Sequence, residues 1–395
     1  MSLERSGYLL VACAGSLAMM LPGPTGGAAV PATAATASGR DSSLVARALP
    51  VAAACTNAQR VESWSLRRLA DQTVTVPVQE SNVAAVTPEV HAGAGGVILF
   101  GDRAPAELRS ALRTLTSKAL GGVPPLVMTD EEGGAVQRMA NLVGSMPSAR
   151  TMAATMTPRQ VRRLATRVGA RMRNAHVTMD LAPVLDLDGG AGPNTTDAIG
   201  ARSFSLDPEV TTRYGLAFAR GMLAADVIPV VKHFPGLGQA TASTDLEPAW
   251  TRPWSDLQRR GLEPFSAAID AGMPAVMVTN ARVPGLTTLP ATLSFEVNRQ
   301  VLRQRLGFHG LVLTDSLSAG AVRLAGYHVP AASVRAIRVG ADMVLFATTT
   351  AEVPDVTRRT VRAMVNAVHT GLLPRSRLQN AALHVLRAKH VELCR

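Results

Sequence analysis

The chain has 395 residues, of which 47% are hydrophobic, so it could form two or three average domains or one barrel-sized domain with an N-terminal extension. The formal net charge of +11 raises the question of nucleic-acid binding. We expect no nucleic-acid partner, because the arginines are scattered along helix faces, aromatic residues make up only 4%, and no RNA-binding signature is present. The charge fits a weak attraction to anionic cell-wall polymers or lipid headgroups as well.

The N-terminus has the pattern of a signal peptide. Arg5 precedes an apolar stretch from Gly7 to Leu21, and small-x-small cleavage sites follow at Ala32-Thr33-Ala34 and Ala35-Thr36-Ala37. We therefore expect residues 1–37 to direct export, and the protein to be secreted or associated with the cell envelope. Leu10-Val11-Ala12-Cys13 also resembles a bacterial lipobox, and acylation of Cys13 would anchor the protein to lipid.

The rest of the chain divides into a short linker and one long domain. Residues 38–54 are small and polar without periodicity, which predicts a linker, and residues 55–395 form the predicted domain. No apolar run after residue 22 is long enough to cross a bilayer, so we expect no transmembrane span in the mature chain. The sequence carries no signal for an oligomeric state.

Within the domain, short apolar runs alternate with amphipathic stretches. One helical pattern covers Pro158 to Ala175, and Thr157-Pro158 and Asp207-Pro208 each place a capping side chain before a proline at the first helical position. The runs predict eight strands: 73–78, 96–100, 125–129, 177–187, 227–231, 275–279, 311–314 and 341–346.

Eight strands alternating with helices predict an α/β fold of the (β/α)8 TIM-barrel type. A doubly wound open sheet is the alternative, but no glycine-rich dinucleotide loop follows the first strand.

The cysteines allow one disulfide in the mature chain. If Cys13 is removed with the signal peptide or acylated, Cys55 and Cys394 remain, an even number in an oxidising compartment. We expect a disulfide between Cys55 and Cys394 at the two ends of the domain. Two unpaired buried thiols are the alternative.

A basic pair ends the fifth predicted strand, where Lys232-His233 is followed by Phe234-Pro235-Gly236. In a barrel, the carboxyl ends of the strands carry the chemistry. Lys118, Lys232 and Lys389 are the only lysines among 40 basic residues, so arginine supplies positive charge almost everywhere else. Lys232 is therefore predicted to act as a compact ammonium, although a basic pair that merely caps a strand is the alternative.

Other polar groups also follow strands, and a barrel would bring them to one face. They are Asp130 to Arg138, Asp186 and Asp188, Arg202-Ser203-Phe204, Asn280, and Thr314 to Ser318. Carboxylates mixed with cations suit a polyhydroxylated substrate and supply a nucleophile for an anomeric carbon. Taken singly, Glu132-Gly133-Gly134 could be a turn, Arg202 a surface ion pair and Asp315 a helix N-cap.

The sequence predicts neither a metal nor another cofactor. It contains no His-x-x-His or Cys-x-x-Cys spacing, and scattered aspartates at strand ends are more often hydrogen-bonding groups than metal ligands.

These motifs resemble glycoside hydrolase family 3, specifically its single-domain bacterial β-N-acetylhexosaminidases, over roughly residues 60 to 390. The family motifs D-Q-E-G-G-R-V-Q-R, A-P-V-x-D, R-S-F, K-H-F-P-G, S-D-D-L-S and A-D-M are similar to residues 130–138, 182–186, 202–204, 232–236, 314–318 and 341–343. The resemblance implies a carbohydrate substrate, with Asp315 as the nucleophile of a retaining hydrolase. It implies that the sugar is held by Asp130, Arg138, Arg202, Lys232 and His233.

The loop after the fifth strand departs from the family. The family's Asp-His pair, which serves as general acid/base, reads Ser243 and Asp245 here. Asp245 could itself be the acid/base, since retaining glycosidases commonly pair two carboxyl groups, and Glu247 is a second candidate. The alternatives to an enzyme that hydrolyses β-linked N-acetylglucosamine from cell-wall-type glycans are a catalytically silent sugar-binding barrel and a glycoside phosphorylase.

Overall fold

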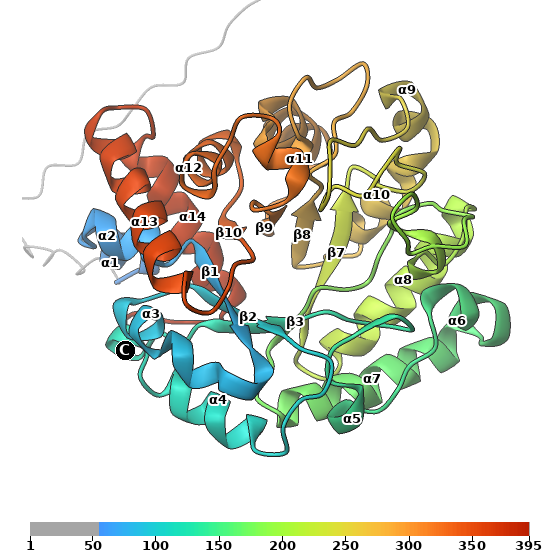
Figure 1. Ribbon diagram of the computed structural model, residues 1–395, viewed down its shortest axis with the longest axis horizontal. Helices are drawn as coiled ribbons and strands as arrows, with labels where there is room; N and C mark the ends of the chain where they lie inside the picture. The colour runs from blue at the N-terminus through green and yellow to red at the C-terminus, as the bar shows by residue number, and fades with distance from the viewer. Residues whose placement is uncertain (1–54, 395) are drawn as a thin grey trace, which may run out of the picture. The chain divides into compact units, whose positions relative to one another are not determined.

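Eight parallel strands close into a barrel in the computed structural model, which describes residues 55–394 (Figure 1). The order around the barrel is β1-β10-β9-β8-β7-β6-β3-β2. The predicted (β/α)8 barrel is therefore confirmed. Its strands are β1 (Val74–Gln79), β2 (Gly96–Phe100), β3 (Leu126–Thr129), β6 (Met179–Asp180), β7 (Ile228–Phe234), β8 (Ala275–Val278), β9 (Leu311–Ser316) and β10 (Met343–Leu345).

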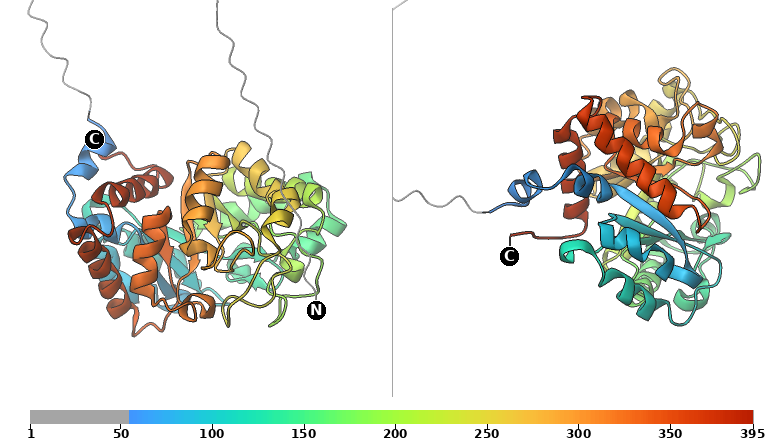
Figure 2. Two further views of the ribbon diagram at one scale, coloured as in Figure 1. Left: turned by 90° about the horizontal axis from the view of Figure 1, so that it is seen from above. Right: turned by 60° about the vertical axis from the view of Figure 1, so that its left-hand side comes forward.

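Helices surround the barrel, as the two further views show (Figure 2). The α-helices are α1 (Asn57–Glu62), α2 (Leu66–Asp71), α3 (Thr87–Ala92), α4 (Leu108–Thr116), α5 (Ala140–Val143), α6 (Ala149–Thr155), α7 (Pro158–Asn174), α8 (Pro208–Leu223), α9 (Trp254–Asp256), α10 (Glu263–Asp270), α11 (Gly320–Arg323), α12 (Val329–Val339), α13 (Val353–His369) and α14 (Arg375–Ala388). The 3₁₀ helices are η1 (Glu80–Val86), η2 (Leu120–Gly122), η3 (Gly200–Arg202) and η5 (Ala291–Leu293). The π-helices are η4 (Leu257–Gly261) and η6 (Glu296–Arg305).

The predicted signal peptide, the lipobox cysteine and the linker of residues 38–54 lie outside the described residues. Among residues 55–394, no helix combines the length and the apolar character that crossing a bilayer requires.

The apolar core has two layers because strand side chains alternate between the barrel interior and the helices. Ile98 in β2 points into the interior cluster, whereas its neighbours Val97 and Leu99 pack in the outer cluster. The interior includes four methionines, whose unbranched side chains fill irregular space: Met128, Met179, Met277 and Met343.

The predicted helix starts are confirmed. Thr157 caps α7 in a capping box with Gln160, and the Asp207 side chain accepts hydrogen bonds from the first turn of α8. The strand predicted over residues 177–187 is wrong in length. Only Met179–Asp180 forms β6, and pairing with β7 resumes as an isolated bridge between Val184 and Lys232. Pro183 lacks the amide hydrogen that a continuous ladder would need. The sequence also missed a short hairpin of β4 (Glu131–Gly133) and β5 (Val136–Gln137).

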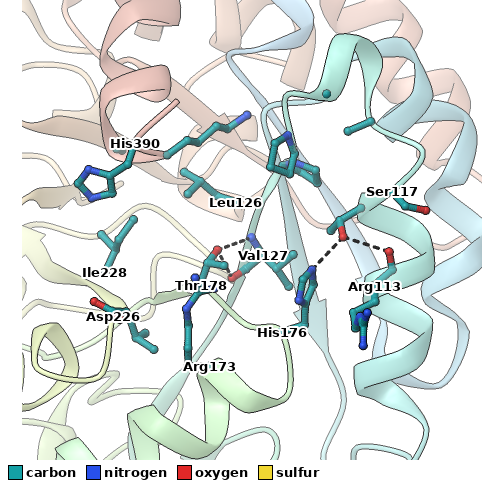
Figure 3. Close-up of a pocket in the computed structure, with 18 of the residues that line it drawn as sticks. Arg113, Ser117, Leu126, Val127, Arg173, His176, Thr178, Asp226, Ile228 and His390 are labelled. Atoms are coloured by element: carbon teal, nitrogen blue, oxygen red, sulfur yellow. Dashed lines mark hydrogen bonds between the residues drawn. The ribbon is translucent and has the colours of Figure 1, made fainter. Parts of the chain in front are cut away.

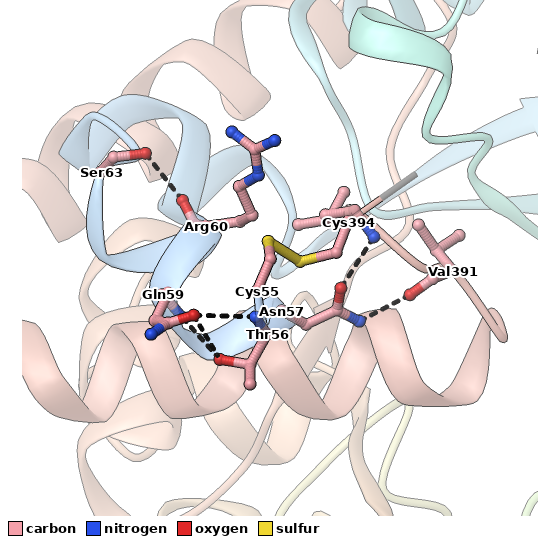
Figure 4. Close-up of a disulfide and its surroundings, with 9 residues drawn as sticks. Cys55, Thr56, Asn57, Gln59, Arg60, Ser63, Val391 and Cys394 are labelled. Atoms are coloured by element: carbon pink, nitrogen blue, oxygen red, sulfur yellow. Dashed lines mark hydrogen bonds between the residues drawn. A yellow bond between two sulfur atoms is a disulfide. The ribbon is translucent and has the colours of Figure 1, made fainter. Parts of the chain in front are cut away.

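The two ends of the described chain are joined covalently, because Cys55 and Cys394 form a disulfide (Figure 4). The side-chain amide of Asn57 adds two hydrogen bonds between the two ends of the chain. Its Nδ2 donates to the carbonyl of Val391 at 2.7 Å, and its Oδ1 accepts from the amide of Leu393 at 2.7 Å.

Removing this crosslink should destabilise the barrel. A crosslink between residues 339 positions apart restricts the unfolded chain, by on the order of 5 kcal/mol in the chain-entropy model. We expect a Cys55→Ser/Cys394→Ser variant to melt roughly 5–10 °C below the parent at one scan rate. Reduced parent protein should melt with the variant, and an unchanged melting temperature would show that the crosslink contributes no stability.

Candidate active site

A pocket of about 470 Å³ opens at the carboxyl ends of the barrel strands. Seven of the eight side chains that the sequence predicted for catalysis or sugar binding line it: Asp130, Arg138, Arg202, Lys232, His233, Asp245 and Asp315. They come from strand ends and loops that lie far apart in the sequence, and the barrel brings them together.

Lys232 is the most buried cation of the pocket, with a side chain 2% exposed. Its Nζ lies 2.6 Å from Asp130 Oδ1 and 2.6 Å from Glu132 Oε1. Burial opposes the charge, but the two carboxylates prevail and raise the pKa of Lys232. Lys232 is therefore a charged ammonium that ties β7 to the hairpin after β3.

Glu132 is a residue whose role the sequence missed. It lies in a hairpin rather than a simple turn, and it accepts from Arg202 Nε and Nη2 at 2.8 Å each. Burial raises its pKa, but Arg202 and Lys232 outweigh burial, so the pKa of Glu132 lies well below its usual value. Arg202 is thus part of a buried ion network, and the surface ion-pair alternative is wrong.

His233 is held by a fully buried carboxylate. Its Nδ1 lies 2.7 Å from Asp186 Oδ2, and Asp186 also accepts from the backbone amides of His233 and Leu237. The other ring nitrogen of His233, Nε2, is a second group that can donate or accept a hydrogen bond. The pairing fixes the orientation of the imidazole at the pocket wall.

Asp315 lies near the end of β9, where its Oδ1 accepts from the amide of Ser316 at 2.7 Å. It does not cap a helix, since α11 begins only at Gly320. The helix-cap alternative is therefore wrong.

The altered loop after β7 brings Asp245 into this pocket and leaves Glu247 outside it. Partial burial and then the charge of Asp315 raise the pKa of Asp245. The loop is fastened to the segment that follows Asp315. The amide of Gly320 donates to the carbonyl of Asp245 at 2.9 Å, and the amide of Ala321 donates to that of Thr244 at 3.0 Å.

Trp250, at the end of this loop, is 41% exposed, and the guanidinium carbon of Arg282 lies 5.7 Å from the centroid of its ring. Asn280, which also follows a strand, donates to the carbonyl of Ser316 at 2.7 Å. Within residues 55–394, no group of three His, Cys, Asp or Glu side chains is arranged to hold a metal ion.

Buried carboxyl groups accompany the hairpin that carries Glu132. The amide of Glu131 donates to Asp180 Oδ1 at 2.9 Å, and Glu131 Oε1 accepts from the amide of Met139 at 2.5 Å. Burial raises the pKa of Glu131 and of Glu80 to about 7, and that of Asp180 well above its usual value. In the described part of the chain, Glu131 Oε2 and Asp180 Oδ2 have no hydrogen-bond partner, which favours the neutral acids.

The sequence is similar to that of known glycosidases. The model of the glycosyl hydrolase family 3 N-terminal domain matches residues 70–388. A protein named β-hexosaminidase LpqI from Mycobacterium tuberculosis is 35% identical over 351 residues, which covers 87% of this chain and 87% of that protein.

Solved structures agree with this similarity. A glycosyl hydrolase of family 3 from Mycobacterium smegmatis matches with a TM-score of 0.75 and 36% identity, covering 83% of this chain and 98% of its own. A family 3 β-N-acetylglucosaminidase from a Paenibacillus strain matches with a TM-score of 0.77 and 28% identity, covering 83% of this chain and 62% of its own.

The buried acid Glu131 should make stability fall as pH rises. Its pKa is about 7 in the folded chain against 4.5 as a model value, so the unfolded chain loses its proton first and stability drops between these two pH values. A Glu131→Gln variant should gain stability over the parent by about 3 kcal/mol between pH 4.5 and pH 8.

Denaturant titrations at both pH values measure this difference. Glu107→Gln, which alters an exposed glutamate, should show no such gain. A Glu131→Gln advantage that does not grow with pH would mean that Glu131 is ionised in the folded protein.

Proposed function

The chain belongs to glycosyl hydrolase family 3, and we propose that it is an exported retaining glycosidase that hydrolyses β-linked N-acetylglucosamine from cell-wall-type glycans. The names of its relatives support a glycoside hydrolase of the β-N-acetylhexosaminidase kind. The signal-peptide pattern of residues 1–37 supports export to the cell envelope or the medium.

One observation carries the catalytic part of the proposal: Asp315 and Asp245 line the same pocket, where burial and then the charge of Asp315 raise the pKa of Asp245. A retaining glycosidase needs one carboxylate as nucleophile and one carboxylic acid as proton donor. A second carboxyl group whose pKa is raised beside Asp315 meets the need for a proton donor. Glu247 lies outside the pocket, so Asp245 is the favoured acid.

In the first step, an Asp315 oxygen attacks the anomeric carbon while Asp245 donates its proton to the departing glycosidic oxygen. The bond from carbon to the leaving oxygen breaks, and a glycosyl ester forms on Asp315. In the second step, the Asp245 carboxylate takes a proton from water, whose oxygen attacks the anomeric carbon. The ester bond breaks, which restores the Asp315 carboxylate and the Asp245 acid.

The remaining pocket groups fit the binding of a sugar ring. Two protons of the Lys232 ammonium face Asp130 and Glu132, which leaves a third donor for a hydroxyl. Arg138 lines the same pocket, and its Nε has no hydrogen-bond partner among the described residues. We assign the hold on the sugar to Asp130, Arg138, Arg202, Lys232 and His233.

A catalytically silent sugar-binding barrel is the second candidate. It is favoured by the loss of the family's Asp-His pair, since Ser243 and Asp245 occupy those positions. The two candidates make opposite predictions for turnover.

Asp315→Ala should abolish turnover, and Asp245→Ala should affect substrates unequally. A disaccharide has a poor leaving group, so losing its acid should slow cleavage roughly 10²- to 10⁴-fold. A dinitrophenyl glycoside departs without help, so glycosylation should change little. Rates with both substrates measure the split, and Glu247→Ala, on the same loop but outside the pocket, should change neither.

Product analysis with and without phosphate distinguishes hydrolysis from phosphorolysis. Protein that binds N-acetylglucosamine but cleaves the activated glycoside no faster than Asp315→Ala is a binding protein, and that result would overturn the proposed function.

Gly320→Ala should slow the proton donation by Asp245, although Gly320 takes no direct part in it. A Cβ at Gly320 would lie 2.1 Å from the carbonyl oxygen of Leu246, so the loop with Asp245 must shift. A displacement of about 1 Å can cost 10²-fold in rate, and we expect a loss of that order for the disaccharide. In Gly189→Ala the new Cβ meets only Leu206 atoms at 3.7 and 3.8 Å, so full activity is expected of this control. Equal rates for the two variants would contradict the docking role of Gly320.

A further inference from the structure

A second cavity, of about 790 Å³, lies at the end of the barrel where the strands begin, and Figure 3 shows residues that line it. Residues at the amino-terminal starts of β3, β6 and β7 line it, including Val127, Thr178 and Ile228. It shares no lining residue with the candidate active site. Any ligand of this cavity would therefore occupy a separate site.

The titratable side chains that line this cavity are predominantly basic. Arg113, Arg173, His176, Lys389 and His390 line it together with one acid, Asp226. Figure 3 shows His176 between Arg113 and Arg173, and its Nε2 lies 2.9 Å from Thr116 Oγ1. Burial, followed by the charges of Arg173 and Arg113, lowers the pKa of His176. The positive charges thus act on one another without a matching set of carboxylates.

Lys389 adds an ammonium that has no carboxylate partner among residues 55–394. Its Nζ donates to Gln72 Oε1 at 2.9 Å, and the buried Gln72 in turn donates to the carbonyl of Gly93 at 2.7 Å. Burial lowers the pKa of Lys389 to about 7. Lysine is rare in this chain, and both Lys232 and Lys389 line a cavity. An anionic ligand would supply the missing counter-charge.

Three non-glycine residues beside the cavity have a left-handed backbone conformation that glycine adopts with less strain. His176, Asp226 and His390 have φ angles of 72°, 56° and 53°, directly after α7, α8 and α14. Helices usually reach this left-handed conformation with glycine, and another residue costs roughly 1 kcal/mol. Among the described residues, Gln239 is the only other non-glycine with positive φ. The strained positions therefore concentrate at this cavity.

We propose that this cavity binds a small soluble organic anion, a carboxylate or phosphate monoester with an apolar body. The arginines and Lys389 attract and hold the anionic group. Pro124, Leu223 and Ile228 offer an apolar wall to the rest of the molecule, and Leu223 is 38% exposed in the structure. Binding an anion beside Lys389 favours its charged form, so binding should take up a proton near neutral pH.

The test uses phenyl phosphate as the probe and the full chain in low salt, measured by calorimetry at pH 6.5. Phenol lacks the charge and inorganic phosphate lacks the apolar body, so each should bind at least tenfold more weakly. An Arg113→Glu/Arg173→Glu variant should weaken phenyl phosphate binding at least tenfold, because both charges are reversed. Arg163→Glu, which alters an exposed arginine of α7 outside the cavity, should bind within twofold of the parent.

Lys389→Met tests the ammonium, and Lys118→Met, outside the cavity, is its matched control. The parent should bind more weakly as pH rises from 6 to 8.5, with proton uptake visible in buffers of different ionisation enthalpy. His176, His390 and Asp226 also face the cavity, beside Arg113 and Arg173, and they are retained in Lys389→Met. The loss of proton uptake near pH 7 in that variant would therefore assign it to Lys389.

Three results would overturn the proposal: no binding of phenyl phosphate, equal binding of phenol, or unchanged affinity after charge reversal. Thermal melting distinguishes lost binding from lost folding, because Arg113 and Arg173 are exposed and their variants should melt with the parent. Turnover of the dinitrophenyl glycoside should be unchanged in every variant, so failure of the glycosidase proposal leaves this test intact.

Discussion

The ammonium of Lys232 is the interaction on which the pocket depends. It lies 2.6 Å from Asp130 and from Glu132, and Glu132 carries the link onward to Arg202. Strand β7, the hairpin after β3 and the segment with Arg202 are thereby fixed to one another by largely buried charges. Such a network is stable only when complete, because removing one partner leaves a buried charge uncompensated, at a cost of about 3–5 kcal/mol. The pocket's shape and its charge pattern therefore have one physical origin.

The other side of the pocket is built differently. Asp245 sits on a loop that is held through backbone hydrogen bonds to Gly320 and Ala321, in the segment that follows Asp315. Those bonds fix the main chain but do not specify the side chain at position 245. The loop can therefore carry different side chains at this position while its main chain stays in place, and here it brings a carboxyl group into the pocket that Asp315 also lines. The side of the pocket with Lys232 and Arg202 has no such freedom, since its side chains themselves form the ion network.

The sequence predicted the barrel because most strands lie in short, largely apolar runs, and strand ends then placed Lys232 and Asp315 on one face. It could not reveal the role of Glu132, whose partners lie 70 and 100 positions away and whose local context, Gly133-Gly134, indicates only a turn. It missed the second cavity for the same reason. That cavity is assembled from helix ends and strand starts, where His176 and Lys389 have no common motif. Local patterns predict elements, whereas partners across the barrel depend on its closure.

The buried acids beside the pocket and the proposed acid Asp245 constrain the working pH in the same direction. Burial raises the pKa of Glu131 to about 7, and Asp245 also has a raised pKa. As pH rises, the ionisation of Glu131 beside Asp180 destabilises the hairpin that carries Glu132, and ionisation of Asp245 removes the proton that the leaving group requires. The raised pKa values of Glu131 and Asp245 therefore both favour action on the acid side of neutrality, although the two residues lie in different parts of the chain and act by different means.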